Sequence, residues 1–262
     1  MDSILESSPW VLPVVGALFG LVWGSFLNVV IHRLPIGESL VTPRSRCPSC
    51  KKPVPGFDNI PVLSYLLLGG KCRHCRIPVS IRYPFVEAVV GGASVASLLR
   101  HGPSLDYACE FAFVASMVAL IFIDYDHQIL PDRITLSGVL IALAVAGPRH
   151  DMTFVEALKG AALGAGSLFF VSEVYFRLRK IEGLGFGDVK MMGMVGAYLG
   201  WKGVLLTLFL GSLSGSSIGL ALMARSGGTM QMKLPFGTFL GIGAIATVYL
   251  GQPVVEWYSG LF

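Results

Sequence analysis

Two aspartates lie where apolar segments of the sequence meet polar ones. Asp124 ends a long apolar run within IFIDYDHQILPD, and Asp188 opens another within GLGFGDVK. Ionisable groups at the edge of a bilayer are costly and are usually functional. Two carboxylates brought close together share a proton, so one can deprotonate a water molecule while the other protonates a carbonyl oxygen. This pair therefore indicates hydrolysis of the aspartic protease type.

Each acidic residue near these runs also has a purely structural interpretation. Asp188 follows a glycine and precedes a helical run, so it could be a helix N-cap, and Asp132 is still more typical of an N-cap. Asp126 could be a solvated loop carboxylate. Glu110 and Glu173 lie within apolar runs, and we expect them to form structural pairs.

Four of the five cysteines form two C-x2-C pairs in one long polar loop. They are Cys47, Cys50, Cys72 and Cys75. This spacing favours one zinc ion bound by four thiolates, a closed and therefore structural site. Two disulfides are disfavoured on the reducing side of a membrane, whereas free thiols or an iron site are also compatible with the spacing. Cys109 lies in an apolar run and is expected to be a small core residue.

Composition places the chain in the membrane class. Only 14% of the residues are charged and the mean hydropathy is +0.69, whereas a soluble domain carries about 25% charged residues. The sequence predicts an all-α, polytopic membrane bundle of about eight transmembrane helices. The expected spans are 9–31, 83–99, 105–123, 134–146, 155–176, 189–200, 203–224 and 234–257. Asp2 and Glu6 replace the basic region of a signal peptide, so the first span is expected to be retained.

The basic residues predict how the chain is oriented. With eight spans, 16 of the 20 lysines and arginines fall on one face, which should be cytoplasmic. Both aspartates and the cysteine loop lie on that face. We expect a first transmembrane helix (1–32), a zinc-binding cytoplasmic loop (33–82) and a membrane bundle that carries the aspartates (83–262). A net charge of +4 is too small to indicate nucleic acid binding.

These segments, taken together, resemble the bacterial type IV prepilin peptidases, which are GxGD-type membrane aspartyl proteases. The resemblance runs in order from Gly24 to Gly241. Besides the two aspartate motifs, it includes GSFLNVVIHRLP from Gly24, NIPVLSY from Asn59, GGKC from Gly69, RYPFVE from Arg82 and PFGTFL from Pro235.

The resemblance implies a bifunctional enzyme of the bacterial inner membrane, with its active site facing the cytoplasm. Such an enzyme cuts the basic leader of a prepilin or pseudopilin after a glycine, and it then N-methylates the new terminal residue with S-adenosylmethionine. By motif match, Asp124 and Asp188 are the catalytic pair and the four cysteines bind zinc. Pilus, secretion and competence systems are not distinguished, and no oligomeric state is predicted.

The site of methyl transfer is not readable from the sequence. Gly69 and Gly70, the segment near Asn28, and Glu87 are weak candidates for shaping it. We expect a turn, a helix-end hydrogen bond and a buried ion pair, respectively, to explain them instead.

Two other functions are compatible with parts of the pattern. A proton-coupled transporter could use Asp124 and Asp188 as a relay, although we would then expect carboxylates near the bilayer midplane and internal repeats. A non-catalytic scaffold could recruit a partner through the zinc loop, but this would leave the two aspartates unexplained.

Overall fold

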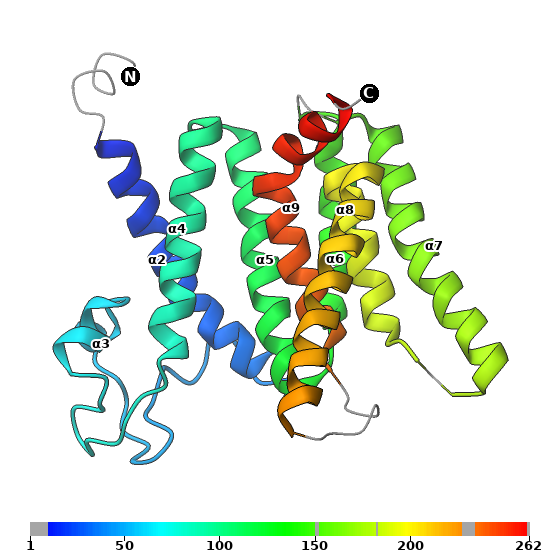
Figure 1. Cartoon of the computed structure of the whole chain (residues 1–262). Helices are drawn as coiled ribbons and strands as arrows, with labels where there is room; N and C mark the ends of the chain where they lie inside the picture. Colours follow the sequence, from blue (N-terminus) through cyan, green and yellow to red (C-terminus); the bar gives the residue numbers. More distant parts are fainter. Residues whose placement is uncertain (1–9, 150–151, 182, 227–233, 261–262) are drawn as a thin grey trace. The chain divides into compact units, whose positions relative to one another are not determined.

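The computed structural model describes residues 10–149, 152–181, 183–226 and 234–260, so the N-terminal acids Asp2 and Glu6 lie outside it. Within these residues, the regular structure is helical, as predicted. The helices are α2 (Val11–Arg33), η1 (Gly56–Asn59), α3 (Leu63–Leu67), α4 (Arg82–His101), α5 (Leu105–His127), α6 (Asp132–Ala146), α7 (Phe154–Arg179), α8 (Phe186–Ser226) and α9 (Phe236–Ser259) (Figure 1).

Each of the eight expected spans falls on one of these helices, and 189–200 and 203–224 share α8. Four described helices are long and apolar enough to cross a bilayer, namely α2, α5, α7 and α8. The membrane class is thereby confirmed, while the number of eight crossings stays a prediction. So does the three-part division at residues 32 and 82.

Contacts divide the chain into two units, residues 1–119 and 120–262. In the first unit, α2 packs closely along α4 through small residues. A Cβ added to Gly20 would lie 2.7 Å from the carbonyl oxygen of Val90 and 2.8 Å from the Cα of Gly91. Gly16, Gly20 and Gly24 recur at four-residue spacing in α2 and so allow this close helix approach.

The second unit contains α6, α7, α8 and α9. Helix α8 breaks at Gly200, which has φ 70° and ψ −178°. A Cβ on Gly241 of α9 would lie 3.4 Å from Met191 of α8, and one on Gly243 would lie 2.8 Å from Thr207 of α8. Residues 191 and 207 would be about 24 Å apart on an unbroken helix. Helix α8 therefore folds back at Gly200, and its two halves run side by side (Figure 1).

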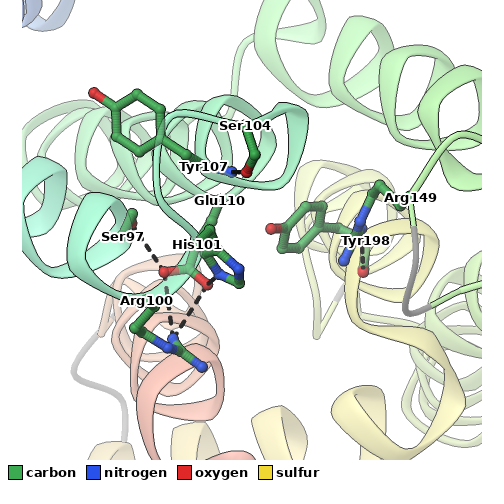
Figure 2. Close-up of polar contacts among 8 residues, drawn as sticks. All are labelled: Ser97, Arg100, His101, Ser104, Tyr107, Glu110, Arg149 and Tyr198. Atoms are coloured by element: carbon green, nitrogen blue, oxygen red, sulfur yellow. Dashed lines mark hydrogen bonds and ion pairs between the residues drawn. The ribbon is translucent and has the colours of Figure 1, made fainter. Parts of the chain in front are cut away.

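A buried acid in the first unit has the structural role expected of it. Glu110 accepts hydrogen bonds from Ser97 Oγ at 2.9 Å and from Arg100 Nη1 at 3.1 Å, and it lies 2.8 Å from His101 Nε2 (Figure 2). These contacts join α4 to α5. Glu173 likewise pairs with Arg177 at 2.7 Å.

Figure 2 also draws a buried cation that belongs to the second unit. Arg149 Nη1 donates to the carbonyl oxygen of Tyr198 at 3.0 Å, and its guanidinium lies 4.2 Å from the centre of the Tyr198 ring. This contact joins the end of α6 to the first half of α8.

Candidate active site and metal site

Asp124 lies in the last turn of α5 and is 5% exposed. Its Oδ2 accepts the backbone N–H of Thr238 at 2.6 Å and the Thr238 hydroxyl at 3.0 Å. Thr238 Oγ1 also lies 3.1 Å from the carbonyl oxygen of Ile121, one turn earlier in α5. The start of α9 thus fixes the carboxylate. No described residue donates to Oδ1, so this oxygen can bind water or substrate.

Asp188 is the third residue of α8 and is 9% exposed. It is therefore not the N-cap, because Gly185 precedes the helix. The backbone N–H of Asp188 donates to the carbonyl oxygen of Gly185 at 3.1 Å, and the Asp188 carboxylate lies near the Gly185 backbone N–H. A carboxylate at the third helical position can stabilise a helix N-terminus in this way. Asp188 thus contributes to the helix N-terminus without being its N-cap, and this role is compatible with a catalytic one.

Leu130 occupies the space between the segments that carry the two aspartates. A Cβ on Gly187 would lie 3.0 Å from Leu130 Cβ, and a Cβ on Gly237 would lie 3.0 Å from both Leu130 Cδ1 and Asp124 Oδ2. Leu130 therefore lies against the start of α8, and Gly237 contacts both Leu130 and Asp124. The second unit thus brings the two predicted carboxylates into one region.

The other acids of this region lie elsewhere. The expectation that Asp132 is an N-cap is wrong, because Pro131 holds that position and makes no side-chain cap. Asp132 instead accepts two hydrogen bonds from Lys190 Nζ, at 2.7 and 2.9 Å, through an exposed carboxylate. Asp126 is exposed in the last turn of α5 rather than in a loop.

The four predicted cysteines cluster in the first unit. Their Sγ atoms all lie within 4.8 Å of one another, and those of Cys47 and Cys75 are 3.7 Å apart. Tetrahedral zinc with Zn–S bonds of about 2.3 Å requires sulfurs about 3.8 Å apart. All four thiols are free of disulfides, and so is that of Cys109. The cluster fits a zinc ion and leaves it no open position.

The two C-x2-C pairs, which we call the cysteine hooks, have the same pattern of backbone hydrogen bonds. In the first, the N–H of Cys47 donates to Lys52 O and the N–H of Lys51 donates to Cys47 O, both at 3.0 Å. The second repeats this pattern from Cys72 to Ile77, at 2.9 and 3.0 Å.

This turn directs backbone N–H groups at sulfur. Those of Cys50 and then Ser49 lower the pKa of the Cys47 thiol to about 6. A thiolate is the form of cysteine that binds metal. The backbone N–H groups therefore favour the metal-binding form of Cys47.

Comparison with known proteins decides the family. Residues 18–101 match the bacterial peptidase A24 N-terminal domain, and residues 111–220 match the type IV leader peptidase family. A relative from Burkholderia pseudomallei (strain 1026b), named prepilin leader peptidase/N-methyltransferase, is 35% identical over 90% of this chain and 84% of its own length. The chain belongs to the type IV leader peptidase family.

Other relatives bear the same name. One from Legionella pneumophila is 32% identical over 99% of both chains. Another, from Myxococcus xanthus, is 40% identical over 80% of this chain and 63% of its own length. No solved structure matches the chain.

The weak candidates for methyl transfer in this family member are explained by local contacts. Gly69 and Gly70 have φ of 60° and 67° and form a turn. Asn28 Nδ2 lies within reach of two carbonyl oxygens, those of Gly24 at 3.3 Å and Tyr83 at 3.1 Å, and so links α2 to the start of α4. Glu87 accepts the backbone N–H of Val62 at 2.7 Å, so its buried partner is an amide rather than a cation.

Thr238 is the site residue that sequence reasoning missed. It lies within PFGTFL, a motif that resembles the family but indicated no role for any single residue. The residue type could have indicated a role, because a threonine hydroxyl at the start of a helix can either cap that helix or donate a hydrogen bond to a nearby carboxylate. Its partner, 114 residues away, could not be inferred.

Proposed function

We propose that the chain is a prepilin leader peptidase with N-methyltransferase activity, located in the bacterial inner membrane. Family membership and the shared name of its relatives support this assignment. The observation that carries the catalytic part is the burial of Asp124 and Asp188 in one region of the second unit, where Leu130 lies against the start of α8 and Gly237 contacts Asp124.

In this mechanism, one aspartate deprotonates a water molecule and the other donates a proton to the scissile carbonyl oxygen. The water then adds to the carbonyl carbon, and the tetrahedral intermediate releases the amine of the mature protein after proton transfer to nitrogen. Thr238 keeps Asp124 in place through Oδ2, which leaves Oδ1 for the water.

The position of the pair suits a substrate that is cut at the membrane boundary. Asp124 is near the end of α5 and Asp188 is near the start of α8, so both lie at helix ends rather than at mid-span. Gly185 and Gly187 precede and flank Asp188, and residues without side chains allow an extended peptide to approach closely. A prepilin whose apolar helix lies in the bilayer would present its leader junction there. This end position also disfavours the proton relay of a transporter.

Zinc, bound by Cys47, Cys50, Cys72 and Cys75, would staple the loop and take no part in cleavage. Methyl transfer rests on the names of the relatives and on the sequence resemblance.

The decisive experiment replaces each carboxylate by an amide. Asp124→Asn and Asp188→Asn keep nearly the same shape but cannot exchange a proton, so leader removal from a purified prepilin should fall about 10²–10⁴-fold. The matched control is Glu173→Gln, which loses an exposed ion pair with Arg177 inside α7. Processing by either dyad variant at the wild-type rate would refute the assignment. Methylation of a pre-cleaved substrate reports separately on the second activity.

A further inference from the structure

Helix α3 carries its apolar side chains on the outside. Leu63, Leu66 and Leu67 share one helical face and are 50%, 67% and 77% exposed. The opposite side contacts the loop through polar groups. Ser64, only 6% exposed, donates to the carbonyl oxygen of Phe57 at 2.9 Å, and Tyr65 donates to that of Val79 at 3.3 Å. In water, a segment with this pattern would turn its leucines inward.

Two more apolar side chains just before α3, Phe57 and Ile60, are exposed as well. We call Leu63, Leu66 and Leu67 the leucine face. Exposed apolar side chains that share one helical face mark a binding site rather than scattered surface hydrophobes.

A part-buried hydrogen bond sets the level of this face along α4. The N–H of Val62, the residue before α3, donates to Glu87 Oε2 at 2.7 Å. Glu87 lies five residues into α4, which begins at Arg82. That position is about 7.5 Å along the helix axis from its first residue. The start of α3 therefore lies beside the end of α4, a helix that packs along the candidate span α2, rather than beyond it (Figure 1).

The loop that carries the leucine face is also rich in basic residues. Residues 33–82 contain nine lysines and arginines but only two acids, Glu38 and Asp58. Asp58 is paired with Arg73 at 2.6 Å. Apart from Arg73, six basic side chains of the loop are exposed, namely Arg44, Arg46, Lys51, Lys52, Lys71 and Arg76. Clustered Lys and Arg beside a membrane helix are attracted to anionic headgroups.

We propose that the leucine face is an interfacial membrane anchor, which inserts among the acyl chains while the basic residues of the loop contact anionic phospholipid headgroups. Exposed leucines, their level beside α4 and the excess of positive charge all fit this one partner. The basic leader of a prepilin would instead be repelled by this loop. The anchor would hold the cysteine cluster at the bilayer surface, and the proposal does not depend on the peptidase assignment.

Photocrosslinking of the full-length protein tests this directly. Benzoylphenylalanine replaces Leu67, and the protein is placed in nanodiscs of phosphatidylglycerol and phosphatidylcholine. Position 18 of α2, where Leu18 is exposed on a membrane helix, is the positive control. We expect a lipid adduct at position 67 with a yield comparable to that at position 18. We also expect most of that yield to be lost after Leu63→Ser and Leu66→Ser, or in pure phosphatidylcholine.

Three results would overturn the proposal. The first is no lipid adduct at position 67 while position 18 gives one. The second is a dominant adduct with a second copy of the chain or with an added prepilin peptide. The third, an equal yield in pure phosphatidylcholine, would remove the role of anionic headgroups. The same adducts should form with Asp188→Asn, so failure of the anchor and failure of the catalytic assignment are distinguishable.

Discussion

Thr238 donates two hydrogen bonds, from its backbone N–H and from its hydroxyl, to the same oxygen of Asp124. This contact joins the last turn of α5 to the first turn of α9 and fixes one member of the aspartate pair. It makes Thr238 a positioning residue, because it acts through Asp124.

Removing only the hydroxyl donor tests this role. Thr238→Val keeps the backbone N–H but loses the O–H···O bond, and a hydrogen bond to a charged group contributes about 1.5–3 kcal/mol. We expect kcat for leader cleavage to fall about 10- to 100-fold with little change in KM, since substrate contacts are unaffected.

Thr238→Ser is the matched control, because serine keeps the hydroxyl. It should restore most of the wild-type kcat. If valine and serine variants cleave equally fast, the hydroxyl does not position Asp124. Steady-state kinetics on a purified prepilin measure both variants.

Gly237 should be intolerant of a side chain. A Cβ there would lie 3.0 Å from Asp124 Oδ2 and from Leu130 Cδ1, so Gly237→Ala must displace one of them. Because the pair must be held closely to share a proton, we expect leader cleavage to fall about 10-fold or more. Gly92→Ala is the control, since an added Cβ in α4 meets nothing within 4 Å. Equal activity of the two variants would show that the site tolerates the extra methyl.

The features that the sequence predicted correctly are those that depend on residues close together in the chain. Apolar runs located the helices, and the cysteine spacing anticipated a cluster. Contacts between distant segments were out of reach. Lys190 pairs with Asp132, 58 residues away, and this pairing corrected the expected N-cap.

The outward leucines of α3 were also unpredictable. A helical period shows that residues share a face, but it does not show which face is buried. That orientation depends on where Ser64 and Val62 find their hydrogen-bond partners.

The cysteine cluster should bind metal through all four thiols. Purified protein should contain about one zinc per chain. Cys72→Ser should lose it, because three thiolates no longer complete the tetrahedron, whereas Cys109→Ser should keep it. Elemental analysis measures the metal, and hydrogen exchange should show the hooks near Cys47 and Cys72 opening when zinc is removed. Retention of zinc by the Cys72 variant would argue against a four-cysteine site.

Gly200 should be required for the fold-back of α8. Its φ of 70° with ψ of −178° lies in a region that only glycine adopts readily, and an added Cβ would lie 3.2 Å from Met152 Cε. A side chain there costs about 1–3 kcal/mol, so Gly200→Ala should lower the free energy of unfolding by that amount. In Gly166→Ala, an added Cβ within α7 meets nothing within 4 Å, and removing a helical glycine should raise stability by about 0.5–1 kcal/mol. Denaturant unfolding in detergent compares the two, and a Gly200 variant as stable as wild type would mean that α8 can turn back without this backbone conformation.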